Sequence, residues 1–165
     1  MTEKEIQKFW EVNLCGNWFI KSKYPSADFF QEYIDFRYNK EHHIKKIVDF
    51  KSSKGKTVLD IGLGVGADAL NWAKHAKSYT GVDLTKAAVE STKTLFKLNN
   101  LNCENIFQGD VISGFENIIP STNKYNIIYS HGVLHHSSNL NTAHSNIKKY
   151  LKKDGKLIIM LYNKD

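Results

Sequence analysis

Short apolar runs alternate with segments of helical periodicity from residue 57 to the end of the chain. The apolar runs predict five strands, at residues 57–62, 78–84, 105–110, 125–131 and 156–162. Because these runs are nearly continuous in Val, Ile and Leu, we expect strands that are buried on both faces of a parallel sheet. With right-handed crossovers, the pattern predicts an α/β fold with a doubly wound, mainly parallel sheet.

Three amphipathic helices are predicted between the strands, at residues 67–76, from Thr85 as the N-cap to Leu98, and at 140–151. A turn at Asp154–Gly155 would then lead into the fifth strand. The apolar positions expected to face the sheet are Ala69, Leu70, Ala73, Ala76, Ala88, Val89, Leu95, Phe96, Leu140, Ala143, Ile147 and Leu151.

The first fifty residues are helical in pattern and rich in aromatic side chains. Ser26 is a candidate N-cap. The helix that follows it would carry one apolar face, and a second short helix another: Phe29, Phe30, Tyr33 and Ile34, then Ile44, Ile47 and Val48. We expect residues 1–50 to form a helical lid or cap region and residues 51–165 to form the ligand-binding α/β domain, in one compact unit.

Composition supports an ordered domain, because 41% of the 165 residues are hydrophobic and only 2 are prolines. The net charge of +6 comes mostly from lysines spread along the chain, with a local cluster at residues 148–156. The chain lacks an arginine-rich patch with interleaved aromatic residues, so nucleic acid is an unlikely partner.

Cys15 and Cys103 match no metal-binding spacing and are too few for a disulfide framework, which favours a cytoplasmic location. The N-terminal residues are polar and charged, unlike a signal peptide. No apolar run reaches the roughly 18–20 residues that are needed to span a bilayer.

Three glycines, Gly62, Gly64 and Gly66, follow the first predicted strand at every second position. A strand that leads through a glycine-rich turn into a helix lets the main chain approach a ligand, and the helix N-terminus favours a carboxylate or a phosphate. Asp83 and Asp110 end the next two predicted strands, so they are expected at the same edge of the sheet.

Two ligand classes fit this turn. Gly62, Gly64 and Ala67 satisfy the dinucleotide pattern, with an acid about twenty residues further on, so an NAD(P)-dependent oxidoreductase is one alternative. Gly66 stands at the wrong step for that pattern, and Asp60 would place a carboxylate near the pyrophosphate. A cationic, zwitterionic nucleoside such as S-adenosylmethionine suits the donors and acids better.

Four motifs then resemble the class I S-adenosylmethionine-dependent methyltransferases, in order and spacing, over roughly residues 42–162: DIGLGVG (60–66), GVDLT (81–85), QGD (108–110) and YSHGVLHH (129–136). They are most similar to the group that methylates small molecules. The resemblance implies a Rossmann-like methyltransferase fold, S-adenosylmethionine as cofactor, S-adenosylhomocysteine as product and a small-molecule methyl acceptor, with an O, N or C nucleophile left open.

The resemblance also implies residues for the methionine half of the cofactor. Its methionine part would lie over Gly62, Gly64 and Gly66, and its amino group would face Asp60. Arg37 and Tyr38, in a stretch similar to the lead-in of some family members, would belong to a lid that touches the carboxylate. A surface arginine and a core tyrosine are the alternative.

For the nucleoside half, the resemblance implies that Asp83 accepts hydrogen bonds from both ribose hydroxyls. Leu84 would pack on the adenine. Asp110, with Val111 beside it, would accept from the adenine amine.

Three histidines, His131, His135 and His136, follow the fourth predicted strand. The resemblance places His131 near the reacting methyl group, and His131 and His135 are the candidate catalytic residues, as neutral bases for a hydroxyl or an amine. Structural histidines are the alternative. A metal site is not expected, because no carboxylate or cysteine lies near them in sequence.

The chain departs from the family after the fifth predicted strand, where the usual fold carries two more strands. We therefore expect an incomplete sheet whose fifth strand is an open edge, inviting a homodimer or a partner chain. A noncatalytic or truncated cofactor-binding module that acts in an assembly is accordingly the alternative to an active enzyme.

Overall fold

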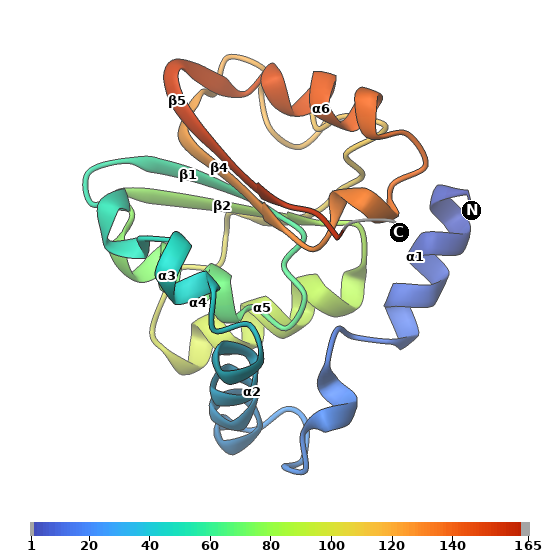
Figure 1. Ribbon diagram of the computed structural model, residues 1–165, viewed down its shortest axis with the longest axis vertical. Helices are drawn as coiled ribbons and strands as arrows, with labels where there is room; N and C mark the ends of the chain where they lie inside the picture. The colour runs from blue at the N-terminus through green and yellow to red at the C-terminus, as the bar shows by residue number, and fades with distance from the viewer. Residues whose placement is uncertain (1, 163–165) are drawn as a thin grey trace.

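The five strands form one parallel sheet in the computed structural model, which describes residues 2–162 (Figure 1). The strand order is β3-β2-β1-β4-β5. The strands are β1 (Thr57–Ile61), β2 (Ser78–Asp83), β3 (Ile106–Gln108), β4 (Tyr125–His131) and β5 (Leu151–Met160). The order reverses between β1 and β4, and ligands bind at such a point in doubly wound sheets. The predicted fold class is confirmed.

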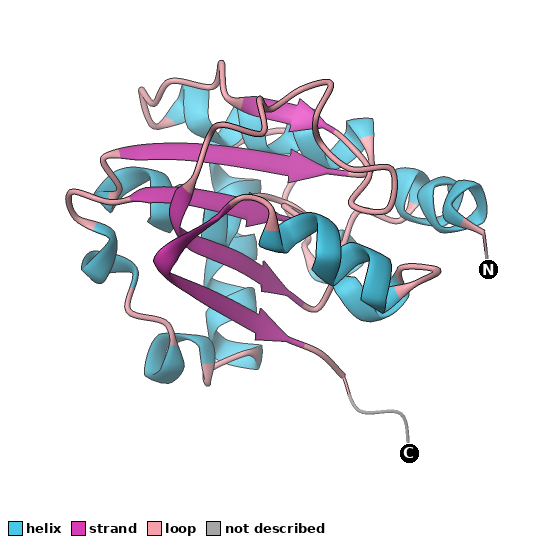
Figure 2. Cartoon of the chain, turned by 90° about the horizontal axis from the view of Figure 1, so that it is seen from above, coloured by secondary structure: helices cyan, strands magenta, loops and turns pink. Residues whose placement is uncertain are grey.

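Helices cover both faces of the sheet, as Figures 1 and 2 show: α4 (Ala67–His75) and α5 (Lys86–Leu98) lie on one face, and α6 (Leu140–Lys148) lies on the other. Successive residues of β1 point to opposite faces. Val58 therefore belongs to the core beneath α4 and α5, and Leu59 belongs to the core beneath α6.

The N-terminal segment contributes α1 (Glu3–Val12), α2 (Ala27–Lys40) and α3 (Ile44–Ile47). Short 3₁₀ turns lie at Asn17–Phe19, Phe50–Ser53 and Leu134–His136. The Ser26 hydroxyl accepts a hydrogen bond of 3.1 Å from the Phe29 amide and so caps α2, as predicted. Phe29, Phe30 and Tyr33 of this helix are buried in the core that β1, α4 and α5 share. The α2 segment thus packs as part of the α/β unit.

Two boundaries near the C-terminus differ from the prediction. The last helix ends at Lys148 instead of residue 151, and β5 already begins at Leu151. The pairing with β4 jumps from Leu151 opposite Tyr125 to Lys156 opposite Ile127, so the predicted turn at Asp154–Gly155 lies in an irregular stretch of β5 between the two paired positions. A bulge in an edge strand here replaces the turn that the Asp-Gly pair favours.

Some apolar positions predicted to face inward are exposed. Ile47 is 67% exposed because α3 is a single turn, which buries Ile44 and Val48 but turns Ile47 outward. Leu140, the first residue of α6, is 43% exposed. Ala73 and Ala76 are only half-buried.

The β5 strand is an edge of the described sheet, and its side chains are half-buried or exposed. This agrees with the expected open edge; that a second copy or a partner covers it stays a prediction. Within residues 2–162, no helix combines the length and the apolar character needed to cross a membrane.

We expect Phe30→Ala to destabilise the whole chain. Phe30 is 2% exposed in the core shared by α2, α4 and α5, so the cavity left behind should lower the free energy of unfolding by about 3–5 kcal/mol. Urea unfolding followed by circular dichroism should show one transition at a lower midpoint. Phe9→Ala, at a side chain that is 50% exposed, should change little. A separate early transition of the N-terminal helices in Phe30→Ala would contradict the shared core.

Candidate functional site

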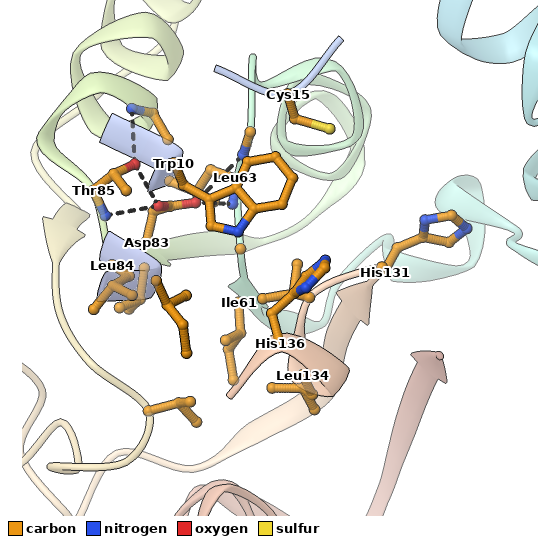
Figure 3. Close-up of a pocket in the computed structure, with 18 of the residues that line it drawn as sticks. Trp10, Cys15, Ile61, Leu63, Asp83, Leu84, Thr85, His131, Leu134 and His136 are labelled. Atoms are coloured by element: carbon orange, nitrogen blue, oxygen red, sulfur yellow. Dashed lines mark hydrogen bonds between the residues drawn. The ribbon is translucent and has the colours of Figure 1, made fainter. Parts of the chain in front are cut away.

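A pocket of ≈ 1060 Å³, part of it open to solvent, lies at the carboxyl ends of the strands (Figure 3). Its wall is formed by the turn after β1, the ends of β2 and β4, the segment after β3 and the inner side of α1. Both apolar and charged side chains line it, among them Leu84, Val111, Asp83 and Asp110, as in sites that bind small molecules. The pocket therefore lies where the strand order predicted a ligand site.

The glycines of the glycine-rich turn leave room for neighbouring side chains, and they also leave main-chain atoms uncovered by any side chain. Gly62 has a φ of +88°, and a Cβ there would lie 2.2 Å from a methyl group of Val133. Gly66, at a φ of +104°, begins α4, and a Cβ there would lie 3.0 Å from the hydroxyl oxygen of Thr92. At Gly64 the nearest atom is the Cβ of Cys15 at 3.7 Å, so the turn presents its open main chain there. Gly62 and Gly64 line the pocket.

Asp83, at the end of β2, ties the neighbouring turns together, as the dashed lines in Figure 3 show. One carboxylate oxygen accepts hydrogen bonds from the amides of Leu63 at 2.7 Å and Gly64 at 3.4 Å. The other accepts from the amide and the hydroxyl of Thr85, both at 2.8 Å. Burial raises the pKa of Asp83, and the hydrogen bonds from Thr85 and Leu63 oppose that rise. The carboxylate thus joins the turn after β1 to the segment after β2, a structural role that could not be predicted from its position in the sequence.

The other residues expected to hold a nucleoside meet at the same pocket. Leu84, Asp110 and Val111 line it together with Asp83. The Asp110 carboxylate accepts from the Ile112 amide and from the Ser113 hydroxyl, each at 2.8 Å, and so shapes the turn after β3. An acid, an aliphatic side chain and a second acid are therefore side by side on two neighbouring strand ends.

Asp60 lies behind the pocket wall instead of lining it. The residue is 1% exposed, and one carboxylate oxygen accepts a hydrogen bond of 3.0 Å from the Tyr79 hydroxyl. The other oxygen, Oδ1, is buried with no hydrogen-bond partner among the described residues. Burial, and secondarily the charge of Asp68, raises the pKa of Asp60 well above its ordinary value. The expectation of a charged group facing the ligand does not fit this environment, which favours the neutral acid.

Asp68, in the first turn of α4, was not singled out from the sequence. Its carboxylate accepts from Arg37 Nε at 3.2 Å, and from the hydroxyls of Tyr38 and Tyr129, each at 2.9 Å. Arg37 Nη2 completes an ion pair with it. Burial alone would raise the pKa of Asp68, but Arg37 and the two tyrosines hold it below the ordinary value. An acid at a helix N-terminus was the available signal.

Arg37 and Tyr38, expected in a lid, are placed differently. Arg37 lines the pocket, whereas the Tyr38 hydroxyl points to Asp68 and to the main-chain oxygen of Ala67, and Tyr38 is not among the pocket-lining residues. Since the charge of Arg37 is already paired with Asp68, little of it is left for a ligand carboxylate.

The histidines after β4 are divided by the structure. His131 and His136 line the pocket, and His135 does not. His135 packs against the rings of His136 and Tyr162 at centroid distances of 4.0 and 5.1 Å. Burial, with the neighbouring charge of Arg37, lowers the pKa of His131, so its imidazole is neutral near pH 7.

The helix α1 closes one side of the pocket through contacts that the sequence did not suggest. Glu11 accepts hydrogen bonds from the Lys86 and Ala87 amides at 3.0 and 2.9 Å, which satisfies the free N-terminus of α5. Gln7 donates to the Leu84 main-chain oxygen at 3.0 Å, and Trp10 lines the pocket. Polar side chains three or four residues apart on a helix are common, so the sequence does not show which distant residues they contact.

Comparison with known proteins gives a consistent result. A family model described as a methyltransferase domain matches residues 52–165. A ubiquinone biosynthesis O-methyltransferase of Glaesserella parasuis is 32% identical over 112 residues, which are 67% of this chain and 47% of that protein. The chain spans less than half the length of the first curated relatives that it matches.

Solved structures share the fold. The YcgJ protein of Bacillus subtilis is 26% identical with a TM-score of 0.61, covering 72% of this chain and 49% of that one. The N-methyltransferase NodS of Bradyrhizobium japonicum, in complex with S-adenosyl-L-homocysteine, has a TM-score of 0.59 at 22% identity, covering 74% and 61%. At that identity, the second likeness bears on the fold alone.

We expect Gly62→Ala to be far more destabilising than Gly64→Ala. At Gly62 an added methyl group meets Val133 and the backbone is left-handed, so strain and overpacking of about 1–3 kcal/mol each should lower the free energy of unfolding. At Gly64 only the left-handed backbone, at a φ of +54°, opposes alanine, which costs about 1–2 kcal/mol. Chemical denaturation measures both, and adding Val133→Ala should restore part of the loss in Gly62→Ala. Equal losses at the two glycines would contradict the packing role.

Proposed function

The chain belongs to the methyltransferase domain family, and on that premise we propose that it binds S-adenosylmethionine and transfers its methyl group to a small-molecule acceptor. The observation that carries this proposal is the meeting of Asp83, Asp110 and the open main chain at Gly64 around one pocket. When bound, the cofactor supplies a methyl group on a positively charged sulfur.

The residues present suit that cofactor. Asp83 and Asp110 are acceptors at neighbouring strand ends, and such acceptors suit ribose hydroxyls and an adenine amine. Leu84 and Val111 offer an apolar surface beside them for the base. The buried Oδ1 of Asp60, which lacks a partner, is a further polar atom behind the glycine turn. As a neutral acid, Asp60 would act there through hydrogen bonding instead of charge.

Alignment of the acceptor with the methyl group is the main task left to the protein. Such positioning supplies on the order of 7–11 kcal/mol of barrier reduction in favourable cases. A base is required only when the nucleophile carries a proton. His131 is an imidazole at the pocket wall that can accept such a proton, and His136, whose pKa burial also lowers, lies at the same wall. We extend no catalytic role to His135, which is not among the pocket-lining residues.

The comparisons bear differently on the two alternative functions that the sequence left open. The family match is to methyltransferase domains over most of the chain, which leaves the NAD(P)-dependent oxidoreductase without support. A noncatalytic cofactor-binding module would use the same acids and the same glycine turn, so it differs from the enzyme only in turnover. The cytoplasmic location stays a prediction from the two free cysteines.

The proposal is tested by binding first and by turnover second. Calorimetry should show binding of S-adenosylmethionine and of S-adenosylhomocysteine, and none of NAD⁺ or NADP⁺. Formation of S-adenosylhomocysteine with a panel of small hydroxyl, amine and thiol acceptors would then identify an enzyme. Failure to bind either sulfur nucleoside, or preferential binding of a dinucleotide, would overturn the proposal. Binding without turnover on any acceptor would favour the noncatalytic module.

We expect Asp83→Asn to weaken binding of S-adenosylmethionine by about 10- to 100-fold, since the amide cannot accept from two ribose hydroxyls as a carboxylate does. Asp154→Asn, an exposed acid on β5, is the matched control and should bind as the unchanged protein does.

The same carboxylate predicts a pH dependence. Because the pKa of Asp83 is raised, it takes up a proton at a higher pH than an ordinary aspartate, and the acceptor form is lost as the pH falls. Affinity for S-adenosylmethionine, measured from about pH 8 down to pH 5, should therefore decline on acidification. The decline should be much smaller in Asp83→Asn. An identical profile in that variant would assign the dependence to another group.

A further inference from the structure

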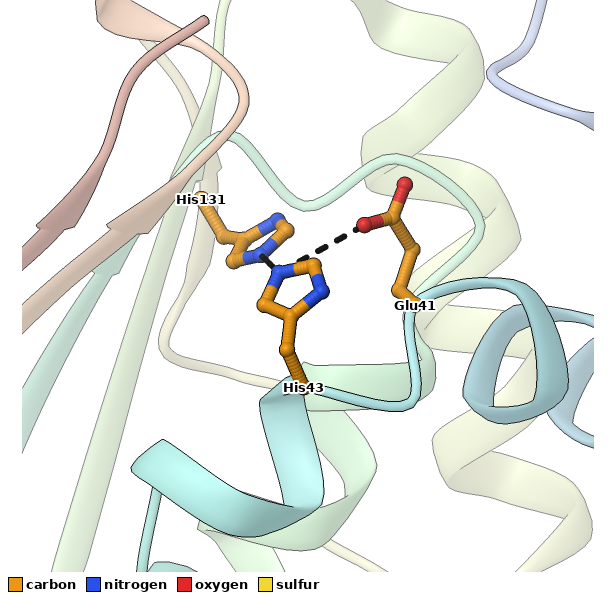
Figure 4. A group of neighbouring side chains, drawn as sticks. All are labelled: Glu41, His43 and His131. Atoms are coloured by element: carbon orange, nitrogen blue, oxygen red, sulfur yellow. Dashed lines mark hydrogen bonds and ion pairs between the residues drawn. The ribbon is translucent and has the colours of Figure 1, made fainter.

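A second cluster of polar side chains adjoins the pocket and shares His131 with the pocket wall. It consists of Glu41, directly after α2, His43, directly before α3, and His131, at the end of β4 (Figure 4). His43 Nε2 lies 3.2 Å from His131 Nε2 and 3.5 Å from Glu41 Oε2. The three candidate ligand atoms all lie within 4.8 Å of one another.

The atoms converge on one point and do not form a chain. In a proton relay through an imidazole, one ring nitrogen receives the proton and the other passes it on. Here both Glu41 and His131 approach the same atom, Nε2 of His43. His43 Nε2 carries at most one proton, so it can donate to Glu41 or to His131. It cannot receive a proton from one of them and pass it on through its other ring nitrogen to the second. A shared cation at the centre satisfies all three lone pairs at once.

The two separations measured from His43 fit a tetrahedral metal ion, and the Glu41–His131 separation is below 4.8 Å. Zinc lies about 2.0–2.1 Å from imidazole nitrogen and 2.0–2.2 Å from carboxylate oxygen, so neighbouring ligand atoms in a tetrahedral site are about 3.3–3.5 Å apart. The separations at His43, 3.2 and 3.5 Å, are close to this value. We propose that Glu41, His43 and His131 bind a divalent metal ion of the zinc type.

The surroundings support a ligand role for these side chains. The Tyr162 hydroxyl donates to Glu41 Oε1 at 3.2 Å, which orients the carboxylate and leaves Oε2 toward the histidines. Such an outer hydrogen bond is typical of carboxylates that ligate metals. The His43 side chain is 39% exposed, so an ion can enter from solvent without unfolding.

Arg37 is the charge that opposes a cation here, and it is already neutralised. Its Nη2 lies 3.5 Å from His131 Nδ1, at the outer limit of a hydrogen bond, while the same group forms a much shorter ion pair with Asp68. Binding of the metal at His131 Nε2 leaves the ring proton on Nδ1, so only this long contact is lost. With the metal bound, the His131 Nε2 lone pair is a ligand and no longer a base.

Three protein ligands leave one position of a tetrahedral ion for water or for another molecule, as in catalytic zinc sites. Because His131 also lines the pocket, the ion would lie at the pocket wall. An oxygen- or nitrogen-bearing acceptor is the class of molecule that could take the free position. This extension rests on the proposed function, whereas the metal assignment stands on the geometry of the three side chains.

Metal binding is tested on the metal-free chain with Co²⁺ and Zn²⁺ alone. Co²⁺ should bind one ion per chain and show the intense visible absorption of tetrahedral nitrogen and oxygen coordination, and Zn²⁺ should displace it. His43→Ala and Glu41→Gln should each weaken binding by at least about 100-fold, and Tyr162→Phe by about 10-fold. His42→Ala, an exposed neighbour that does not contribute a ligand atom, is the matched control and should bind normally.

Several results would overturn the assignment. These are the absence of Co²⁺ and Zn²⁺ binding by the unchanged chain, full binding by Glu41→Gln and His43→Ala, or an equal loss in His42→Ala, which would indicate adventitious binding by surface histidines. Thermal melts show whether each variant is folded, and the nearly isosteric Glu41→Gln change keeps the test valid if His43→Ala does not fold. Measuring S-adenosylmethionine binding on the same samples separates the two proposals. Metal binding without cofactor binding would refute the proposed function alone.

Discussion

The arrangement of the whole site depends on one buried carboxylate, that of Asp68. A buried charge is tolerated only when it is paired and its lone pairs are satisfied. Asp68, in the first turn of α4, meets this requirement with side chains from two other elements: Arg37 and Tyr38 of α2, and Tyr129 of β4. These hydrogen bonds therefore fix α2 to the sheet at the point where the strand order reverses. The ion pair with Asp68 also holds Arg37 beside His131.

This network also changes how the pocket attracts its ligand. From the sequence, Asp60 was expected to face the amino group of the cofactor. In the fold, Asp68 is ionised and paired with Arg37, while burial drives Asp60 toward its neutral form. Two neighbouring acids are thus pushed to opposite protonation states by their surroundings. Asp83 and Asp110 line the pocket and offer hydrogen-bond acceptors there, whereas Asp60 is buried behind the glycine turn.

The part of this molecule that could be predicted from sequence is the part whose signal is local. Each central strand is a short apolar run, and Asp83 ends one of them, so topology alone brings it to the pocket. The start of β5 could not be predicted, since Leu151 already pairs with Tyr125 before the irregular stretch that contains Asp154–Gly155. The packing of Gly62 against Val133 and of Gly66 against Thr92 could not be read from the sequence, because these partners lie far away along the chain.

The two sides of the pocket therefore differ in how they are encoded. The cofactor side is built from successive strand ends, and its residues lie in order along the chain. The opposite side joins α2 and the segment before α3 to the end of β4, so that His43 and His131, 88 residues apart, come within contact distance. Motifs based on short sequence spacings could suggest His131 and His135 as a pair of metal ligands. They could not identify His43 or Glu41, which lie far from His131 in the sequence. Since the cofactor side resembles a large family, the chemistry particular to this chain is to be sought on the side that only folding assembles.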